Sequence, residues 1–476
     1  EARRLRQHPG IPGHGQPDTG ADDARLETVM VYARRLTPVS RVAATVTVID
    51  QARIETTLAT DIRELVRYEP GLSVRNDPFR FGLDTISVRG LGGNRVAVEV
   101  DGIPAAGGFA VGSYADSGRA YVDAAFVDRV EFLRGPASSL YGSDAIGGVV
   151  AMTTLTPESL LARGEGDYAV RTDAGFDSAS DGWRAAALAA GAIGGTQWLV
   201  GYSRREGHES DTAADVTPNP SEYTQDSALM KVTSAVPGGP LTLTAEAGRI
   251  QQATDVDAFL GVGRFLNTTA LAGDDEMLRY RVSLGQALTG ANAAFDSADW
   301  NAYWQGTETD QEAYEVRRAV PPRTPPAQLD RTFKFDESTL GVEFTAVKSL
   351  GSGSIVHDVV YGFEATRSEL DELRDGLQTN LTTGATTPTI LGETFPLRDL
   401  PLSTVVEIGA FVQDEVQFDD ARWTLVPALR VDYYDLTPET DRIYREDNPA
   451  TVPPGLDASP FATKLGETYR FSDRHR

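Results

Sequence analysis

Apolar and polar residues alternate with a period of two in one segment after another from Tyr168 onward. In the first of these segments Tyr168, Val170 and Phe176 share one face, whereas Arg171 and Asp173 share the other. Such alternation predicts a β-strand whose two faces meet different surroundings. The clearest further examples lie at 198–202, 241–247, 278–284, 300–304, 340–346, 359–363, 408–412 and 425–433. With weaker segments included, the pattern predicts about 12 strands.

The connections between these segments alternate between tight turns and long polar loops. The tight turns lie at 194–195, 237–240, 350–354 and 419–421, and the long loops lie at 207–225, 305–336, 367–403 and 436–460. Strands of about 9–11 residues, with short turns at one rim and long loops at the other, are typical of an outer-membrane β-barrel. The tryptophans near strand ends would form aromatic girdles; they are Trp183, Trp198, Trp300, Trp304 and Trp423.

A soluble β-sandwich is the alternative interpretation of the alternating segments. A sheet with one packed face and one wet face produces similar alternation. It leaves unexplained why long and short connections alternate so regularly along the chain. The pattern therefore favours a transmembrane barrel.

The residues before Tyr168 have a mixed pattern that predicts a small α+β domain. Strand-like runs lie at 45–49, 85–89, 95–100, 130–133 and 146–152. Between the first two, Ile62, Leu65 and Val66 share one face of a short predicted helix, which Pro70 stops. A short β-prone run stands alone at 27–33, and the polar residues before it are rich in proline and glycine, which predicts a disordered leader.

Composition and charge narrow the range of functions. The chain has 476 residues, with 44 basic and 69 acidic side chains, so its net charge is −25, and it contains no cysteine. An acidic chain is a poor partner for nucleic acid, because binding to phosphates relies on Lys and Arg. The lack of cysteine excludes disulfide frameworks and thiolate metal sites. No run reaches the 18 or so apolar residues of a transmembrane helix.

Searches for short catalytic motifs give no candidate enzyme. The nucleotide-binding fingerprint G-x-G-x-x-G, the nucleophile elbow G-x-S-x-G, the zinc motif H-E-x-x-H and the calcium loop of EF-hands are all missing. We therefore expect no enzymatic activity, no catalytic residues and no intrinsic cofactor, and we assign no metal ligand.

Three glycine-rich motifs in the α+β region carry a specific resemblance. They read SVRGLGGNRV at 87–96, VDG at 100–102 and VEFLRGPASSLYGSDAIGGVV at 130–150. In this order, and followed by barrel periodicity, they closely resemble the plug domain of TonB-dependent outer-membrane receptors. The segments RYEPGLSV at 67–74 and DPFRFG at 77–82 are similar to those of the haemoglobin/haem/transferrin receptors within that family.

The resemblance implies a mainly β fold in which an N-terminal α+β plug domain sits inside a transmembrane antiparallel β-barrel. It divides the chain into a disordered leader at 1–26, a TonB box at 27–33, the plug at 34–156 and a partial barrel at 157–476. The family's barrel has about 22 strands. Because the last residues do not read as a final strand, we expect the barrel to be truncated at the C-terminus.

The resemblance also implies a function in the bacterial outer membrane. It is the active, TonB-dependent transport of an iron-containing ligand, with haem or haem-protein iron favoured. A ferric-siderophore receptor of the same fold is the alternative, and a passive channel or a surface protein that binds without transport is a third possibility. The implied partners are TonB with its ExbB/ExbD energising complex, outer-membrane lipid, and the iron-bearing ligand or a host haem protein.

For the TonB box, the expected contact with TonB is the addition of an extended strand to a partner. Its residues are Glu27, Thr28, Val29, Met30, Val31, Tyr32 and Ala33. The alternative is that this run forms an ordinary first strand of the plug sheet. Arg89 and Arg134 are expected to lock the plug to the barrel by pairing with acidic residues of the strands, unless they are solvated surface charges.

The ligand is expected to bind between the long external loops and the plug apices. Candidate contact residues are Arg80, Phe109, Tyr114 and Asp116. The five histidines, at 8, 14, 208, 357 and 475, leave the plug without one, so Tyr114 is the candidate plug ligand to haem iron. The alternative for Tyr114 is a simple aromatic contact.

Overall fold

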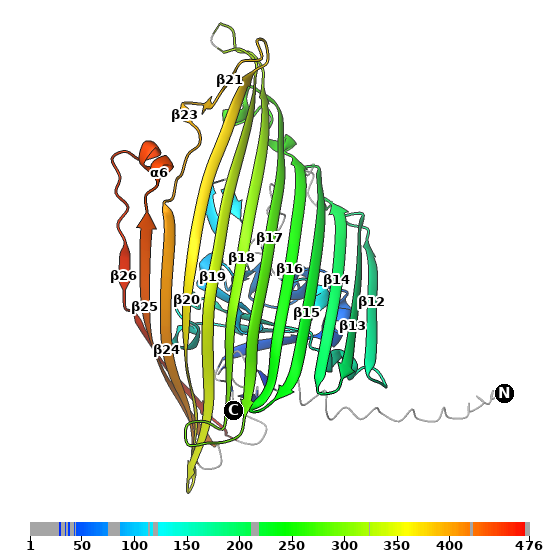
Figure 1. The fold of residues 1–476 in the computed structure, drawn as a ribbon, viewed down its shortest axis with the longest axis vertical. Helices are drawn as coiled ribbons and strands as arrows, with labels where there is room; N and C mark the ends of the chain where they lie inside the picture. Colours follow the sequence, from blue (N-terminus) through cyan, green and yellow to red (C-terminus); the bar gives the residue numbers. More distant parts are fainter. Residues whose placement is uncertain are drawn as a thin grey trace, which may run out of the picture.

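The computed structural model describes residues 28–29, 34, 37–38, 42, 44–74, 86–112, 115–117, 122–210, 219–322, 324–418 and 422–471. Figure 1 shows one large curved sheet of long strands lying side by side, with a smaller domain, coloured blue to cyan, lying behind it. The chain order is the smaller domain first and the sheet second. The expected mainly β fold with an N-terminal plug is confirmed.

The large sheet is antiparallel, and its long strands pair in the order of the sequence. Its strands are β12 (Tyr168–Asp177), β13 (Gly182–Ile193), β14 (Thr196–His208), β15 (Ser221–Val236), β16 (Gly239–Asp255), β17 (Thr268–Thr289), β18 (Ser297–Arg317), β19 (Ala327–Ser352), β20 (Ile355–Asn380), β21 (Thr386–Thr387), β24 (Leu402–Phe418), β25 (Trp423–Glu439), β26 (Leu456–Ala458) and β27 (Phe461–Tyr469). Without the two- and three-residue strands β21 and β26, 14 − 2 = 12 strands remain, as the alternation predicts. Within the described residues β12 and β27 do not pair, so the sheet is curved but open.

The predicted long loops at 305–336 and 367–403 are wrong in extent. Strands β19 and β20 each have 26 residues and pair along their whole length, from Ala327 opposite Asn380 to Ser352 opposite Ile355. In this part of β19 the sense of the alternation is reversed, because Leu329, Phe333 and Phe335 are buried on the inward face whereas Lys334 and Asp336 are exposed on the outward face. The tight turns predicted at 194–195, 237–240 and 350–354 are confirmed, and 419–421 lie outside the described residues.

The outward face of the large sheet is apolar and exposed. Val170 is 74% exposed, Leu340 63% and Phe363 46%. Further exposed apolar side chains on this face are Tyr168, Phe176, Val200, Tyr202, Leu243, Val282, Leu284, Trp304, Ile408, Leu429 and Val431. In water such a surface would be unstable, whereas a band of this kind is what lipid covers in outer-membrane barrels. Among the described residues, no helix combines the length and the apolar character that a membrane crossing requires.

The plug is built on a five-stranded sheet in the order β3-β10-β11-β6-β7. These strands are β3 (Thr45–Asp50), β6 (Val96–Val100), β7 (Ile103–Pro104), β10 (Val127–Arg134) and β11 (Gly148–Thr154), and the helices of this region are α2 (Gln51–Thr57), α3 (Ile62–Val66), α4 (Ser138–Tyr141) and α5 (Pro157–Leu161). One apolar core joins sheet and helices, and the predicted helical face Ile62, Leu65 and Val66 is buried in it. The expected α+β domain is confirmed.

The remaining elements are short pairs of strands and single turns of helix. They are β1 (Thr28–Val29) with β2 (Thr37–Pro38), β4 (Leu72–Val74) with β5 (Ile86–Val88), β8 (Phe109–Gly112) with β9 (Ala115–Ser117), β22 (Thr389–Ile390) with β23 (Glu393–Thr394), the 3₁₀ turns Gly93–Arg95, Ala124–Phe126, Asp257–Phe259 and Gly263–Phe265, and α6 (Arg442–Asp447). Helix α6 and the pair β22/β23 belong to the connections at the upper rim, opposite the tight turns (Figure 1).

On one side, apolar packing holds the plug against the large sheet. Phe126, Leu155 and Leu160 form a buried cluster with side chains of β13, β14 and β15; the strand residues are Leu188, Ala190, Leu199 and Leu229. Gly201 of β14 allows this close approach, because a Cβ there would lie 2.9 Å from the Phe126 ring. We name this cluster the apolar anchor.

The apolar anchor predicts a large effect of replacing its central ring. Phe126 is 1% exposed, so Phe126→Ala leaves a cavity at the plug–sheet contact and should lower the free energy of unfolding of the plug by about 3–5 kcal/mol. Calorimetry of the purified protein in detergent would measure the loss. The matched control is Phe176→Ala, because Phe176 is 69% exposed on the outward face. Equal effects of the two substitutions would contradict the assignment.

Candidate functional site

The strongest polar contact between the plug and the sheet is centred on Asp101. This residue lies in the turn between β6 and β7 with φ 54°, a left-handed conformation that Asp and Asn tolerate well. Its carboxylate lies 3.1 Å from the Lys231 ammonium of β15 and 3.3 Å from the Arg281 guanidinium of β17. The backbone N–H and the hydroxyl of Thr154 also donate to it, at 2.8 and 2.7 Å. The carboxylate is therefore satisfied from both domains, and we name this group the Asp101 lock.

The two basic residues of the Asp101 lock are buried, and further charged residues of the sheet adjoin them. Arg281 is 1% exposed and also donates to the Val100 carbonyl of the plug. Glu246 of β16 forms an ion pair with Arg281 at 3.2 Å and accepts a hydrogen bond from Arg279. Burial alone would raise the pKa of Asp101, but Lys231, Arg281 and the hydrogen bonds from Thr154 together hold it below its usual value. Asp101 thus stays ionised between the two cations.

A second polar contact surrounds Arg34, which directly follows the predicted TonB box. Its guanidinium lies 3.2 Å from Glu99 of the plug, and 3.9 and 3.4 Å from Glu343 and Glu364 of the sheet. The rings of Tyr141 and Phe411 lie 4.6 and 5.1 Å from its central carbon, which adds cation–π contacts. Burial raises the pKa of Glu99 to about 7, although Arg34 opposes the shift.

A third contact runs from the sheet to α4. Arg430 of β25 donates to the Leu140 carbonyl at 3.0 Å and pairs with Glu364 and Asp432. Gly142, with φ 81°, ends α4, and a Cβ there would lie 3.2 Å from this guanidinium. A side chain at position 142 would be strained at this φ and would require the Arg430 guanidinium to move by a few tenths of an ångström.

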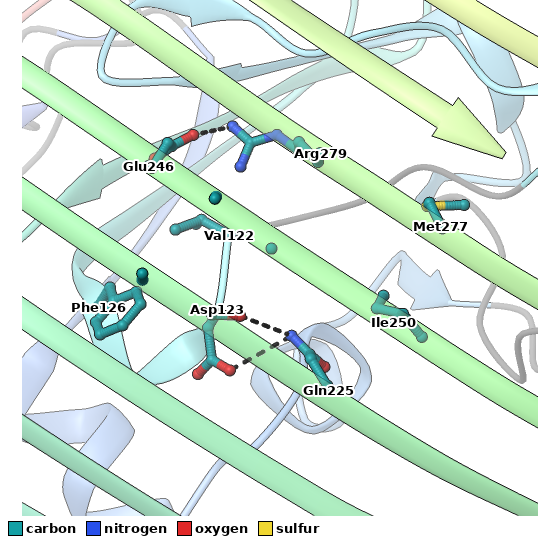
Figure 2. A pocket seen from close by; sticks show the side chains of 12 residues that line it. Val122, Asp123, Phe126, Gln225, Glu246, Ile250, Met277 and Arg279 are labelled. Carbon is teal, nitrogen blue, oxygen red and sulfur yellow. Dashed lines mark hydrogen bonds and ion pairs between the residues drawn. The ribbon is translucent and has the colours of Figure 1, made fainter.

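Figure 2 shows a fourth contact, beside the apolar anchor. Asp123 of the plug accepts from Ser203 at 2.9 Å and from Gln225 at 3.4 Å, and the pair of Glu246 with Arg279 lies next to them. The enclosed cavity has a volume of about 20 Å³, which is room for a single water molecule. The plug and the sheet are therefore closely fitted here.

The two arginines predicted to lock the plug to the barrel bond within the plug instead. Arg134 donates to Glu69 at 3.1 Å and to Thr47 at 2.7 Å, and Arg89 reaches Thr45 at 3.5 Å. Strand β10 pairs with β3 so that Arg134 lies opposite Thr45, and Thr47, two positions along β3, is on the same face. At Asp101 and at Leu140, plug oxygens face basic side chains of the sheet, whereas at Arg34 a basic side chain faces carboxylates of the sheet, which is the expected direction at a different residue.

The predicted ligand-binding residues are only partly described. Phe109 lies in β8 and Asp116 in β9, a short hairpin of the plug, and their side chains are not described. Arg80 and Tyr114 lie outside the described residues. In the described part of the chain, no group of three or more His, Cys, Asp or Glu side chains is placed to hold a metal ion.

The predicted TonB box is described at two positions. Thr28 and Val29 form β1, which pairs with β2 and stands apart from the five-stranded plug sheet. Glu27, Met30, Val31, Tyr32 and Ala33 lie outside the described residues. The alternative of an ordinary first strand of the plug sheet therefore does not match the described pairing.

Sequence reasoning did not assign the residues of the Asp101 lock, although a signal for them exists. Asp101 belongs to the VDG motif at 100–102, which was recognised without a role for its carboxylate. Lys231 and Arg281 occupy inward positions of β15 and β17, where the alternation places side chains toward the plug. A basic residue at an inward position is the feature that would have indicated them.

Comparisons with known proteins match both domains. The TonB-dependent receptor plug domain matches residues 38–149, and the TonB-dependent receptor-like β-barrel matches residues 201–476. The chain belongs to the TonB-dependent receptor family. This is a family of transport receptors rather than of enzymes, and its members reside in the bacterial outer membrane, as this receptor does.

Among curated proteins, the receptor is similar to the vitamin B12 transporter BtuB of Vibrio vulnificus, with 34% identity over 137 residues, 28% of this chain and 21% of that protein. It is 28% identical to transferrin-binding protein A of Haemophilus influenzae over 218 residues, 42% of this chain and 23% of that protein. The matches thus span less than a quarter of the length of these relatives.

Among solved structures, the ferripyoverdine receptor of Pseudomonas aeruginosa has a TM-score of 0.65 at 16% identity, covering 94% of this chain and 57% of that one. The hemophore receptor HasR of Serratia marcescens has a TM-score of 0.60 at 15% identity, covering 89% and 60%. At identities this low, the similarity to these structures shows a shared fold and nothing more.

The Asp101 lock predicts a pH-dependent stability. Asp101→Asn keeps the size and the left-handed turn but removes the anion beside Lys231 and leaves Arg281 with Glu246 alone, so the plug should lose about 3–5 kcal/mol at neutral pH. Because the folded-state pKa of Asp101 is lowered, its contribution is present above the unfolded-state pKa and is lost as the pH falls through the folded-state value. The difference from wild type in unfolding temperature should therefore shrink in acid. Asp257→Asn, at an exposed position of the upper rim, is the control.

Proposed function

We propose that this receptor imports an iron-bearing ligand across the bacterial outer membrane, driven by TonB acting on residues 27–33. The single observation that carries the proposal is the position of Arg34. It directly follows the segment that TonB would pull, and its guanidinium is buried between plug and sheet carboxylates. A force on the segment therefore reaches the plug–sheet contact through one residue.

The polar nature of the plug–sheet contacts supports this mechanism. A charged pair that is separated can be rehydrated, so displacement of the plug exchanges buried pairs for solvated charges. Binding of ligand at the outer face would shift the population of the TonB box toward a released state, which is coupling between two sites. TonB, with the ExbB/ExbD complex as its energy source, would then pull on the released segment.

The names of the relatives support a range of ligands. They include a vitamin B12 transporter, a transferrin-binding protein, a ferripyoverdine receptor and a hemophore receptor. Most of these names refer to iron carriers, and we therefore propose an iron-bearing ligand. Haem or haem-protein iron, as in the haemoglobin/haem/transferrin receptors, and a ferric siderophore are the two candidate classes.

Deleting residues 27–33 tests the proposed function. Uptake of ⁵⁵Fe, supplied separately as haem, a hydroxamate chelate and a catecholate chelate, should be lost in iron-starved cells, because the pulling point is gone. Binding of the same ligands to the cell surface should persist, because the plug and its outer face remain. Deleting seven leader residues, 10–16, is the matched control and should leave uptake unchanged. Uptake that survives the deletion of residues 27–33 would refute the proposal.

Substituting Tyr114 tests the haem candidate. If Tyr114 is an axial ligand of ferric haem, Tyr114→Ala should weaken haem binding and shift the Soret band of the bound haem. Absorption spectroscopy of the purified receptor titrated with haem would measure both, with Tyr68→Ala at an exposed plug position as the control. An unchanged spectrum and affinity would remove Tyr114 from the ligand set and favour a siderophore.

A further inference from the structure

A cavity of about 520 Å³ lies between the plug and the large sheet, beside the tight turns of the lower rim. The plug contributes Glu99, Asp101 and Thr153 to its lining, and strands β15 to β19 contribute the facing wall. The volume lies within the range of cavities that hold small-molecule ligands. Nothing in the proposed function yet assigns a role to this space.

The wall of the cavity carries both uncharged and charged polar side chains. Hydroxyl and amide groups come from Thr233, Thr242, Thr244, Ser283, Asn301 and Thr345, and the carboxylates of Asp299 and Glu343 lie among them. One inward step farther from the turns, strands β15, β16 and β17 carry Lys231, Glu246 and Arg281, which form the Asp101 lock and its continuation. The lock therefore lies at the upper end of a space lined by hydroxyl, amide and carboxylate groups.

The two sides of the plug are held in different ways. Over β13, β14 and Leu229 of β15, the apolar anchor fixes the plug through Phe126 and its neighbours. From Lys231, the next inward residue of β15, to Arg281 of β17, the Asp101 lock is an ion pair above an open cavity. Moving the plug away from β13 would expose apolar surface to water, whereas moving it away from β17 separates charges that water can solvate. Displacement should therefore begin at the lock.

We propose that this cavity is the periplasmic half of the permeation path, and that it opens upward when Asp101 leaves Lys231 and Arg281 while the apolar anchor stays closed. The proposal deepens the proposed function and rests on it for one point, that the pull of TonB on residues 27–33 displaces the plug. It assigns the path to the β15–β19 side of the plug.

The lining also defines a class of solute. Six carboxylates face two cations, Arg34 and Lys231; the carboxylates belong to Glu99, Asp101, Glu131, Glu158, Asp299 and Glu343. Free anions are repelled by such a surface, whereas neutral or cationic solutes that offer hydroxyl and amide groups can bond to the wall. The path therefore suits a hydrophilic iron chelate without net negative charge.

Swelling of proteoliposomes tests the path without TonB and without the natural ligand. The complete protein with Lys231→Met and Arg281→Met lacks both cations of the lock, so glucose should enter several-fold faster than through the wild type. Gluconate, an anion of similar size, should enter more slowly than glucose. If the double variant does not assemble, Lys231→Met alone is used; it removes one of the two cations, so glucose entry should rise by a smaller factor that still exceeds the wild-type rate.

Thiol labelling locates the leak, since the chain has no cysteine of its own. In the lock variant, Thr233→Cys labelled with a bulky methanethiosulfonate should return glucose entry to the wild-type rate. The matched control is Ala235→Cys, two residues nearer the turn on the same face of β15, exposed and outside the lining; its label should leave entry fast.

Three results would overturn the proposal: no gain in glucose entry after the lock is removed, a leak that the label at position 233 does not block, or a leak that the label at position 235 blocks equally. Equal entry of gluconate and glucose would overturn the solute class. Because no TonB is present, these failures are distinct from survival of uptake after deletion of residues 27–33. That second result would refute the proposed function alone.

Discussion

Charge buried between the plug and the wall of the sheet is the interaction on which the rest of the structure depends. Asp101 holds two cations of the sheet, and Arg34 holds carboxylates of both domains. Such pairs are favourable only while both partners stay in place, because each ion left alone in the interior carries a large desolvation cost. The contact is therefore either made or broken as a unit, which suits a plug that must be tight at rest and released on demand.

The surroundings of these charges make the release directional. The apolar anchor gains its stability from area removed from water, and Gly201 lets the Phe126 ring reach the wall. The adjoining contact, from Lys231 of β15 to Arg281 of β17, gains its stability from charge and leaves a polar space beneath it. If the plug moves, we expect the apolar anchor to stay in place and the edge of the plug at the Asp101 lock to separate first. Arg34, next to the segment proposed for TonB, lines the cavity at this edge.

The fold could be predicted from the sequence far better than the site. Alternation of period two reports which face of a strand is buried, and it correctly indicated the number of strands from residues such as Val170 and Leu340. It did not report where β19 and β20 end, because in the upper part of β19 the apolar side chains, such as Phe333 and Phe335, lie on the inward face and the outward face is polar. The partner of Arg134 depends on where the turn between α3 and β4 places Glu69, which the local pattern around Arg134 does not encode, so the expected bond to the barrel became a bond to Glu69. Lys231 and Arg281 could have been found from their inward positions, but their common partner required the three-dimensional structure.

The unequal height of the wall has a consequence for how a ligand first meets the cell. A strand of 26 residues is about 85 Å long, and at a tilt of about 45° it rises some 60 Å, roughly twice the hydrocarbon thickness. Strand β12, with 10 residues, barely spans that layer. The upper rim therefore slopes from its highest point, at β19 and β20, to its lowest point, at β12 (Figure 1). The residues that connect β20 to β24 therefore lie far above the end of β12, so anything that approaches the upper rim from above reaches this connection before it reaches the plug (Figure 1).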